Sequence, residues 1–149
     1  MDHEYSTSAL SAGQVGWNWF ALQLDDGSEL TVYTIRRSDG SIDPYSRGMI
    51  VRKDGSTISL SARDFKIESS STWKSPGSGA VYPAQWTVEV PGENLVLNVT
   101  PYIPDQELRV SFTYWEGAVK IGGSRNGVQV SGSGYVELTG YAQSLAGQF

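Results

Sequence analysis

The sequence predicts an all-β domain, built as an up-and-down antiparallel β-barrel of about eight to ten strands. The first observation is that short runs of alternating apolar and polar residues recur along the chain, each bounded by Gly, Pro, Asp or Asn. The second is composition, because the 149 residues include 17 Gly, 8 Tyr and 5 Trp, whereas the helix formers Ala, Lys and Glu are sparse. No long amphipathic helix and no internal repeat interrupts this pattern.

The clearest local signal lies between residues 114 and 141. Two β-rich runs are joined there by Asn126-Gly127, which favours a two-residue hairpin turn because Gly accepts a positive φ without strain. In the second run, alternation predicts two opposite faces, one with Val136 and Leu138, the other with Tyr135, Glu137, Thr139 and Tyr141. A carboxylate flanked by tyrosines belongs either to a solvated rim or to the wall of a pocket.

The other strands follow from the same alternation. They are expected at residues 17–24, 29–37, 47–53, 57–60, 64–70, 85–90, 95–101 and 106–115. Turns rich in Gly, Asp and Pro separate them, at residues 25–27, 38–40, 54–55 and 91–94. One helical turn is expected over residues 8–14 and a loop over residues 73–80.

Length and composition exclude several classes of protein. A chain of this size buries one core, so we expect one domain over residues 1–149. The net charge of −5 argues against nucleic-acid binding, and the absence of Cys removes disulfides, thiolate zinc sites and a cysteine nucleophile. No apolar run approaches the roughly 20 residues that span a bilayer. No signal peptide opens the chain, so the expected location is cytoplasmic by default, or periplasmic if the chain is cut from an exported protein.

Four titratable residues are candidates for catalysis. Glu116 and Glu137 lie within apolar, aromatic strands, where an unpaired carboxylate is costly. If these residues are catalytic, one of them is a desolvated acid with a raised pKa, able to protonate an alkene. The alternative is that they pair with Arg36, Arg109 or a tyrosine hydroxyl and lock strands together. Asp2 and His3 are weaker candidates, because adjacent residues of a strand point to opposite faces and an exposed role explains them equally well.

Neither a metal site nor a cofactor is expected. His3 is the only histidine, and no Gly-x-Ser-x-Gly motif accompanies it. Asp105 and Glu107 follow Pro104 at the start of a strand, where a turn cap and a rim charge explain them.

Aromatic residues exceed what the core of one small barrel needs. Most of them pack in the core, but the strand at residues 17–24 has two apolar faces, so its second face is covered by a ligand, another domain or another subunit. The residues expected to bind a ligand are Trp17, Trp19, Tyr33, Trp73, Tyr82, Trp86, Tyr114, Trp115, Tyr135 and Tyr141.

Seven motifs, in order along nearly the whole chain, resemble the carotenoid 1,2-hydratase and AttH-like family. They are Asp2-His3-Glu4-Tyr5-Ser6-Thr7, Gly16-Trp17-Asn18-Trp19-Phe20, Trp73-Lys74-Ser75-Pro76, Tyr82-Pro83, Asp105-Gln106-Glu107-Leu108, Tyr114-Trp115-Glu116-Gly117 and the run from Gly134 to Tyr141. Members of this family pair two lipocalin-like barrels, and the motifs resemble only the C-terminal one. The resemblance therefore implies a lipocalin-like barrel that is half of a two-barrel protein or a stand-alone relative, with a preceding barrel or a homodimer partner.

The resemblance leaves the activity open, because the family includes hydratases, Diels-Alder cyclases and AttH-like proteins associated with export systems. We expect the barrel to bind an apolar small molecule, isoprenoid or lipid-like, in its cavity. The alternative is a lyase-type enzyme that adds water to an isoprenoid double bond, or a Diels-Alder-type cyclase. On that hypothesis Glu137 lies among Tyr135, Tyr141 and one of the tryptophans, shielded from water.

Overall fold

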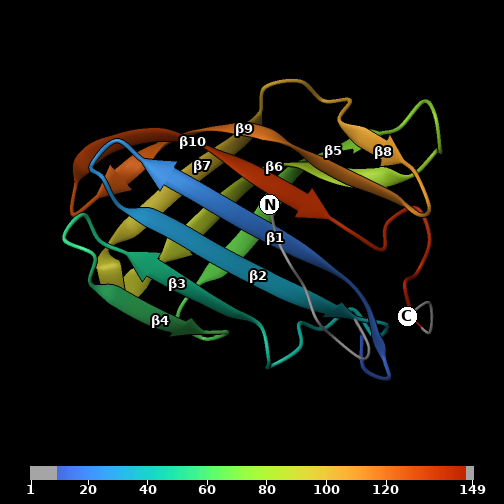
Figure 1. The fold of residues 1–149 in the computed structure, drawn as a ribbon, viewed down its shortest axis with the longest axis horizontal. Helices are drawn as coiled ribbons and strands as arrows, with labels where there is room; N and C mark the ends of the chain where they lie inside the picture. Colours follow the sequence, from blue (N-terminus) through green and yellow to red (C-terminus); the bar gives the residue numbers. More distant parts are fainter. Residues whose placement is uncertain (1–9, 147–149) are drawn as a thin grey trace.

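Tight turns between alternating strands fold the chain into one curled antiparallel sheet (Figure 1). The computed structural model describes residues 10–146. The strands are β1 (Gln14–Leu24), β2 (Glu29–Arg37), β3 (Arg47–Val51), β4 (Thr57–Ser61), β5 (Lys66–Lys74), β6 (Val81–Val90), β7 (Leu95–Pro101), β8 (Glu107–Arg109), β9 (Thr113–Arg125) and β10 (Val128–Leu138). The one helical element in these residues is a short 3-10 turn, η1 (Pro91–Glu93), and no helix there is long and apolar enough to cross a membrane.

Strands that are adjacent in the chain are mostly neighbours in the sheet. Their order is β4-β3-β2-β1-β10-β9-β7-β6-β5, and β8 pairs with β9. β7 pairs with residues 119–125 of β9 and β8 with residues 113–115, so both lie along one edge of that strand. Within the described residues, β4 and β5 stand at the two ends of this order and do not pair with each other, so the sheet is a curled half-barrel. The all-β, antiparallel, barrel-like fold predicted from the sequence is confirmed, with ten strands in residues 10–146.

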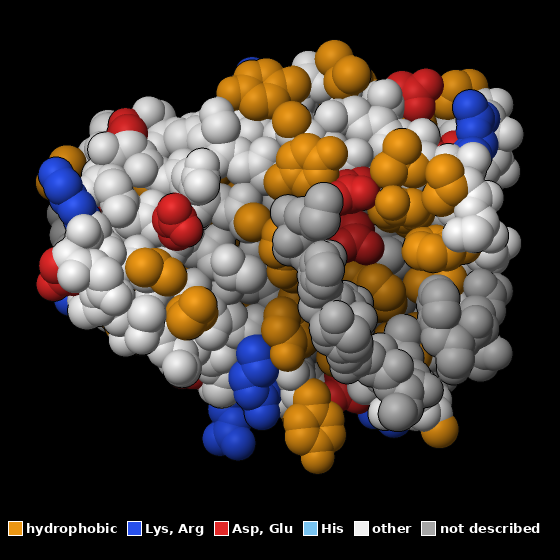
Figure 2. Space-filling model, viewed as in Figure 1, with side chains coloured by type: hydrophobic (Ala, Val, Ile, Leu, Met, Phe, Trp, Pro, Cys, Tyr) orange, Lys and Arg blue, Asp and Glu red, His pale blue; other side chains and the backbone are white. Residues whose placement is uncertain are grey.

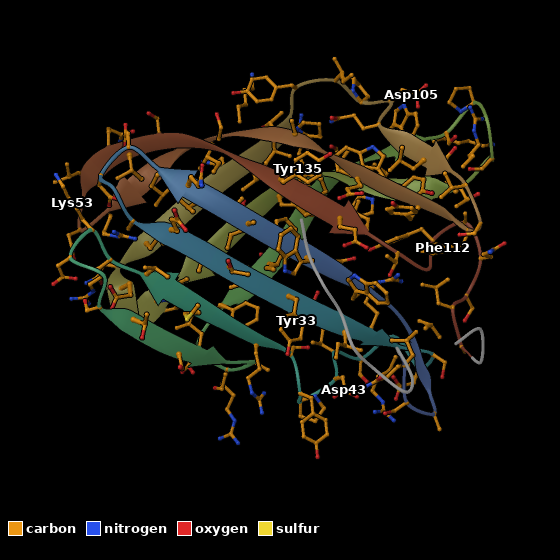
Figure 3. All side chains as sticks on the ribbon, viewed as in Figure 1. Tyr33, Asp43, Lys53, Asp105, Phe112 and Tyr135 are labelled. Carbon is orange, nitrogen blue, oxygen red and sulfur yellow. The ribbon has the colours of Figure 1, made fainter. Side chains whose placement is uncertain are left out.

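Alternation gives the sheet an inner face, turned to the core, and an outer face. Side chains of the inner face that are at most 1% exposed include Phe20, Leu22, Leu30, Val32, Ile50, Val88, Leu95, Leu97, Val119, Val136 and Leu138. The alternate residues of these strands project from the outer face. Among them are Tyr33 of β2 and Tyr135 of β10, which lie on the side turned to the viewer in Figure 3. The core therefore fills the concave side of the sheet.

The turns confirm the hairpin predicted at Asn126-Gly127. Both residues have positive φ, 50° and 77°, and they join β9 to β10. Gly132 lies where β10 comes close to β1. A Cβ atom at this position would lie 2.0 Å from the carbonyl oxygen of Gln23 on β1, so only glycine lets β10 come this near.

Several predicted boundaries differ from the structure. β1 and β6 begin earlier than expected, and β5 extends to Lys74, so the loop predicted at residues 73–80 is shorter. The strand expected at 106–115 is two strands, because the chain bends at residues 110–112 and β8 folds back against β9. Of the helical turn expected at 8–14, the described part is a non-helical turn with Gly13 at φ 83°.

Replacing Gly132 with alanine is expected to lower the free energy of unfolding by about 1–3 kcal/mol, because the new methyl group meets backbone atoms that cannot rotate away. Gly122→Ala is the matched control, since no atom lies within 4 Å of a Cβ built on this outer-face glycine. Urea denaturation of both variants measures the difference. Equal stability of the two would contradict the close approach of β10 to β1.

Candidate ligand-binding site

A cavity of about 200 Å³ lies where β6 and β7 separate. Hydrogen bonding between the two strands ends at the pair Trp86–Val99, two residues before Pro101, which has no backbone N–H to donate. The apolar lining comprises Trp73, Tyr82, Pro83, Ala84, Pro101, Pro104 and Trp115. We call this space the aromatic cavity.

The rings around the aromatic cavity pack against one another and continue into the core. Trp73 and Tyr82 are stacked, with ring centroids 6.1 Å apart and planes 25° apart. The Trp115 ring lies 6.1 Å from that of Trp86, which is 3% exposed. The Trp115 indole N–H donates to the Pro104 carbonyl oxygen at 2.8 Å and so fixes the orientation of this wall.

A buried carboxylate, Glu107 at the start of β8, ties the aromatic cavity to the neighbouring loop. It accepts hydrogen bonds from the hydroxyls of Ser75 at 2.7 Å, Ser78 at 2.5 Å and Tyr82 at 3.0 Å, and the Arg109 Nε lies 4.0 Å away. The Glu107 side chain is 1% exposed. We call Glu107 with these three hydroxyl donors the Glu107 clasp, which joins β6, β8 and the loop between β5 and β6.

The electrostatics of the Glu107 clasp keep the carboxylate ionised and the phenol protonated. Burial alone would raise the pKa of Glu107, but the hydrogen bonds from Ser78, Ser75 and Tyr82, together with the charge of Arg109, outweigh burial and hold the pKa below its usual value. Burial and then the hydrogen bond to Glu107 raise the pKa of Tyr82. Tyr82 is therefore a permanent donor and Glu107 a permanent acceptor near neutral pH.

Tyr141 lies on the inner side of the sheet, not beside Glu137 as expected. Gly140 has a φ of 73°, which breaks the alternation of β10 and turns the next side chain inward. The Tyr141 ring packs 5.5 Å from the Tyr82 ring and 3.8 Å from the guanidinium carbon of Arg36, and its hydroxyl donates to Asn18 at 3.0 Å. Burial raises the pKa of Tyr141 and lowers that of Arg36.

The outer face of the sheet holds the other predicted residues. Figure 2 shows hydrophobic and acidic side chains gathered on this face, over β1, β9 and β10. Its aromatic members are Trp17 and Trp19 of β1, Tyr33 of β2, Tyr114 of β9 and Tyr135 of β10. Four of them are half-buried and Tyr135 is 43% exposed. That a ligand, another domain or another subunit covers this face stays a prediction.

Glu116 and Glu137 face each other on this outer surface. They are direct cross-strand partners of β9 and β10, and Glu137 is also opposite Trp19 of β1. Burial, followed by the carboxylates of Glu116 and Glu137, raises the pKa of Tyr114. The arginines proposed as partners lie elsewhere, because Arg36 packs on Tyr141 and Arg109 lies beside Glu107. Glu116 and Glu137 are half-buried, and neither lines the aromatic cavity.

Asp2 and His3 lie outside the described residues, and no group of three or more metal-binding side chains occurs within residues 10–146. Glu107 was predicted to be a rim charge, and the structure buries it instead. The serines that surround it are about 30 residues away in the sequence, and no motif spacing links them.

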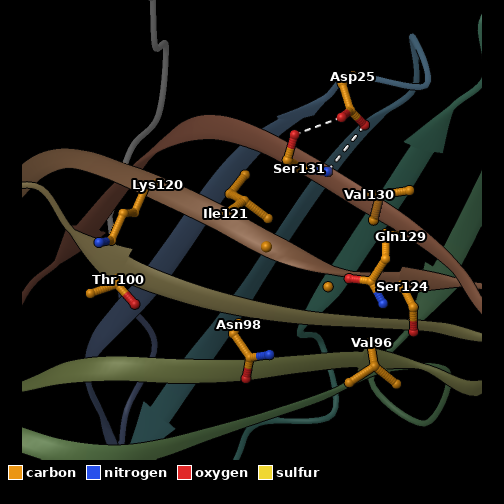
Figure 4. A pocket seen from close by; sticks show the side chains of 12 residues that line it. Asp25, Val96, Asn98, Thr100, Lys120, Ile121, Ser124, Gln129, Val130 and Ser131 are labelled. Atoms are coloured by element: carbon orange, nitrogen blue, oxygen red, sulfur yellow. Dashed lines mark hydrogen bonds between the residues drawn. The ribbon is translucent and has the colours of Figure 1, made fainter.

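A larger hollow, of about 700 Å³, lies on the outer face of β7, β9 and β10 (Figure 4). Its side chains are mainly polar, and Asp25 accepts hydrogen bonds from the backbone and hydroxyl of Ser131 at 3.1 and 2.6 Å. Asn98, Lys120 and Gln129 also line it, and no aromatic residue does. The hollow is larger than the aromatic cavity, but its chemistry does not suit an apolar ligand.

An antiparallel half-barrel with an aromatic cavity between two of its strands has a lipocalin-like architecture. The AttH-like family model matches residues 1–141, and the chain belongs to this family. An AttH protein from Nitrosomonas europaea is similar in structure, with 34% identity and a TM-score of 0.80, over 91% of this chain and 42% of that one.

Kievitone hydratase from Nectria haematococca shares the fold at 20% identity and a TM-score of 0.71, over 87% of this chain and 40% of the hydratase. The chain thus spans about two fifths of the length of both proteins. The comparison with curated proteins gave no match.

Glu107→Gln is expected to lower the free energy of unfolding at pH 7 by about 2–3 kcal/mol, because three hydroxyl donors lose a charged acceptor. The folded-state pKa lies below the usual 4.5, so this stability is present above that value and is lost as pH falls through the folded-state pKa. Urea denaturation at pH 7 and pH 3 should show the difference between wild type and variant shrinking in acid.

Glu68→Gln is the control for this experiment, because the Glu68 side chain is 60% exposed and its pairing with Lys66 contributes little. A Glu107→Gln variant as stable as wild type at pH 7, or a loss of stability that persists unchanged at pH 3, would contradict the role of the Glu107 clasp.

Proposed function

We propose that this domain binds an apolar small molecule, isoprenoid or lipid-like, in the aromatic cavity. The observation that supports this most is the lining, in which Trp73, Tyr82 and Trp115 surround a space at a break in the sheet. Ligand sites are mostly apolar concavities with a few fixed polar groups, and here the Tyr82 hydroxyl is fixed by Glu107.

The size of the aromatic cavity limits what it holds. Its volume of about 200 Å³ is below the roughly 300–1,000 Å³ typical of ligand pockets. It therefore takes one ring or a short branched segment, and the remainder of a longer ligand extends through the gap between β6 and β7. A cyclic isoprenoid of ten carbons is a suitable probe for this space.

The alternative function, acid-catalysed hydration, requires a carboxylic acid beside the double bond. Glu107 accepts a hydrogen bond from Tyr82 of the cavity wall. Its hydrogen bonds favour the anion, which cannot donate a proton to an alkene. Glu116 and Glu137 project from the outer face instead. These features support binding ahead of hydration, although one structural neighbour is a hydratase.

Titration with limonene, a ten-carbon hydrocarbon, tests the proposal. Nuclear magnetic resonance of the indole N–H groups follows each of the five tryptophans separately. The signals of Trp73 and Trp115 should shift in a saturable manner. Ala84→Phe, which fills the cavity, should weaken binding about tenfold or more, because each CH₂ group excluded from an apolar site costs ~0.8 kcal/mol.

The control variant is Gln129→Phe, which adds a phenyl ring to an exposed position of the outer face. It should bind limonene as wild type does. If limonene shifts no tryptophan signal, or if Ala84→Phe binds it with unchanged affinity, the proposed function is wrong.

A further inference from the structure

The aromatic cavity and the larger hollow on the outer face (Figure 4) share a lining residue. Thr100 of β7 belongs to the walls of both, so the two spaces meet at this side chain. Leu97 and Val99 of β7 are buried in the core, and alternation therefore places Asn98 and Thr100 on the outer face. A molecule that leaves the aromatic cavity beside Thr100 emerges at the edge of the hollow.

The aromatic cavity has lining residues from both faces of the sheet. Trp115 belongs to the inner face, whereas Gln85 of β6 and Thr100 of β7 belong to the outer face. The last paired residues of β6 and β7 are Trp86 and Val99, so the ladder has ended where Gln85 and Thr100 lie. The cavity therefore passes between the two strands. A narrow link such as CH₂–O can connect a group in the cavity to a group in the hollow.

The part of the hollow beside Thr100 is polar and has an open floor. Figure 4 shows Thr100 and Lys120 at one end of the hollow, where they are cross-strand partners of β7 and β9. The next pair of the same face is Asn98 and Gly122. Asn98 and Lys120 are exposed, and no atom lies within 4 Å of a Cβ built on Gly122. A group placed over Gly122 therefore lies beside the Asn98 amide and next to the Lys120 ammonium group along β9.

The charges of the hollow favour an uncharged group. Its two charged lining residues, Lys120 and Asp25, have opposite signs, and Asp25 already accepts two hydrogen bonds from Ser131. The other polar side chains that line it are amides and hydroxyls, which both donate and accept, as the hydroxyl groups of a sugar also do. The volume of about 700 Å³ lies within the roughly 300–1,000 Å³ of ligand pockets.

We propose that the ligand consists of an apolar part, bound in the aromatic cavity, and an uncharged hydroxylated head group, such as a sugar, bound in the hollow. Thr100 lies at the junction of the two parts, and Asn98 and Lys120 bind hydroxyl groups of the head group. This inference rests on the proposed function and adds a head group of stated chemistry to the apolar ligand.

Perillyl alcohol and its β-D-glucoside form a matched pair for the test, because both carry the ring skeleton of limonene and only the glucoside has a sugar. The glucoside should bind roughly tenfold more tightly, as expected for two hydrogen bonds. In nuclear magnetic resonance spectra, both ligands should shift the indole N–H signals of Trp73 and Trp115. Only the glucoside should also shift the backbone N–H signal of Gly122 and the side-chain amide signals of Asn98.

Gly122→Phe fills the floor of the hollow, and the open space at its Cβ lets the variant fold. It should bind the glucoside no more tightly than the alcohol. Asn98→Leu keeps the size of the side chain and removes its hydrogen bonds, so the preference for the glucoside should fall roughly threefold. Val128→Phe is the control, because Val128 is 69% exposed and lines neither space, and it should keep the wild-type preference.

Three results would overturn the inference and leave the proposed function standing. They are equal affinity of wild type for the two perillyl ligands, a Gly122 signal that the glucoside does not move while Trp73 and Trp115 respond, and a folded Gly122→Phe variant that keeps the preference. If Gly122→Phe does not fold, the two wild-type measurements still decide the question. If neither limonene nor the perillyl ligands shift a tryptophan signal, both the proposed function and this inference are wrong.

Discussion

The loss of hydrogen bonding between β6 and β7 is the constraint on which the proposed site depends. β7 continues along β9 to Pro101, while its pairing with β6 stops at Trp86–Val99. Where the two strands separate, a space remains beside side chains of the inner face. Trp115 and Tyr82 thereby become the walls of a cavity, although each is no more than 2% exposed.

Such a gap needs other contacts to hold its sides in place. The Glu107 clasp supplies them, because one carboxylate joins β8 to β6 and to the loop that follows β5. A charged acceptor buried among hydroxyl donors is stable only when its geometry is satisfied, so it also fixes the orientation of Tyr82. Tyr141 then packs on Tyr82 from the segment after β10, and Arg36 covers the opposite end of this aromatic row.

The strands could be predicted from the sequence because alternation and turn residues are local signals. The two-residue turn at Asn126-Gly127 also sets the register of β9 and β10, which brings Glu116 opposite Glu137. Three features of the site could not be predicted in this way. Tyr141 turns inward because of the positive φ of Gly140, which alternation does not reveal. The Glu107 clasp joins residues about 30 positions apart, and the end of the β6–β7 ladder depends on the path of β7 in space.

Residues of one chemical type therefore divide into two sets with different surroundings. Trp73, Tyr82, Trp86, Trp115 and Tyr141 lie at or behind the aromatic cavity, whereas Trp17, Trp19 and Tyr33 project outward with Glu116 and Glu137. Membership of the AttH-like family fixes the architecture, and the chain spans about two fifths of the length of its solved relatives. The ligand site that we propose is formed by residues of the first set.

A crystal structure of the protein under xenon pressure tests the apolar character of the aromatic cavity most directly, because xenon enters apolar cavities. The account predicts a xenon atom between Trp73, Tyr82 and Trp115. Ordered water in that space, with no xenon bound there, would contradict it.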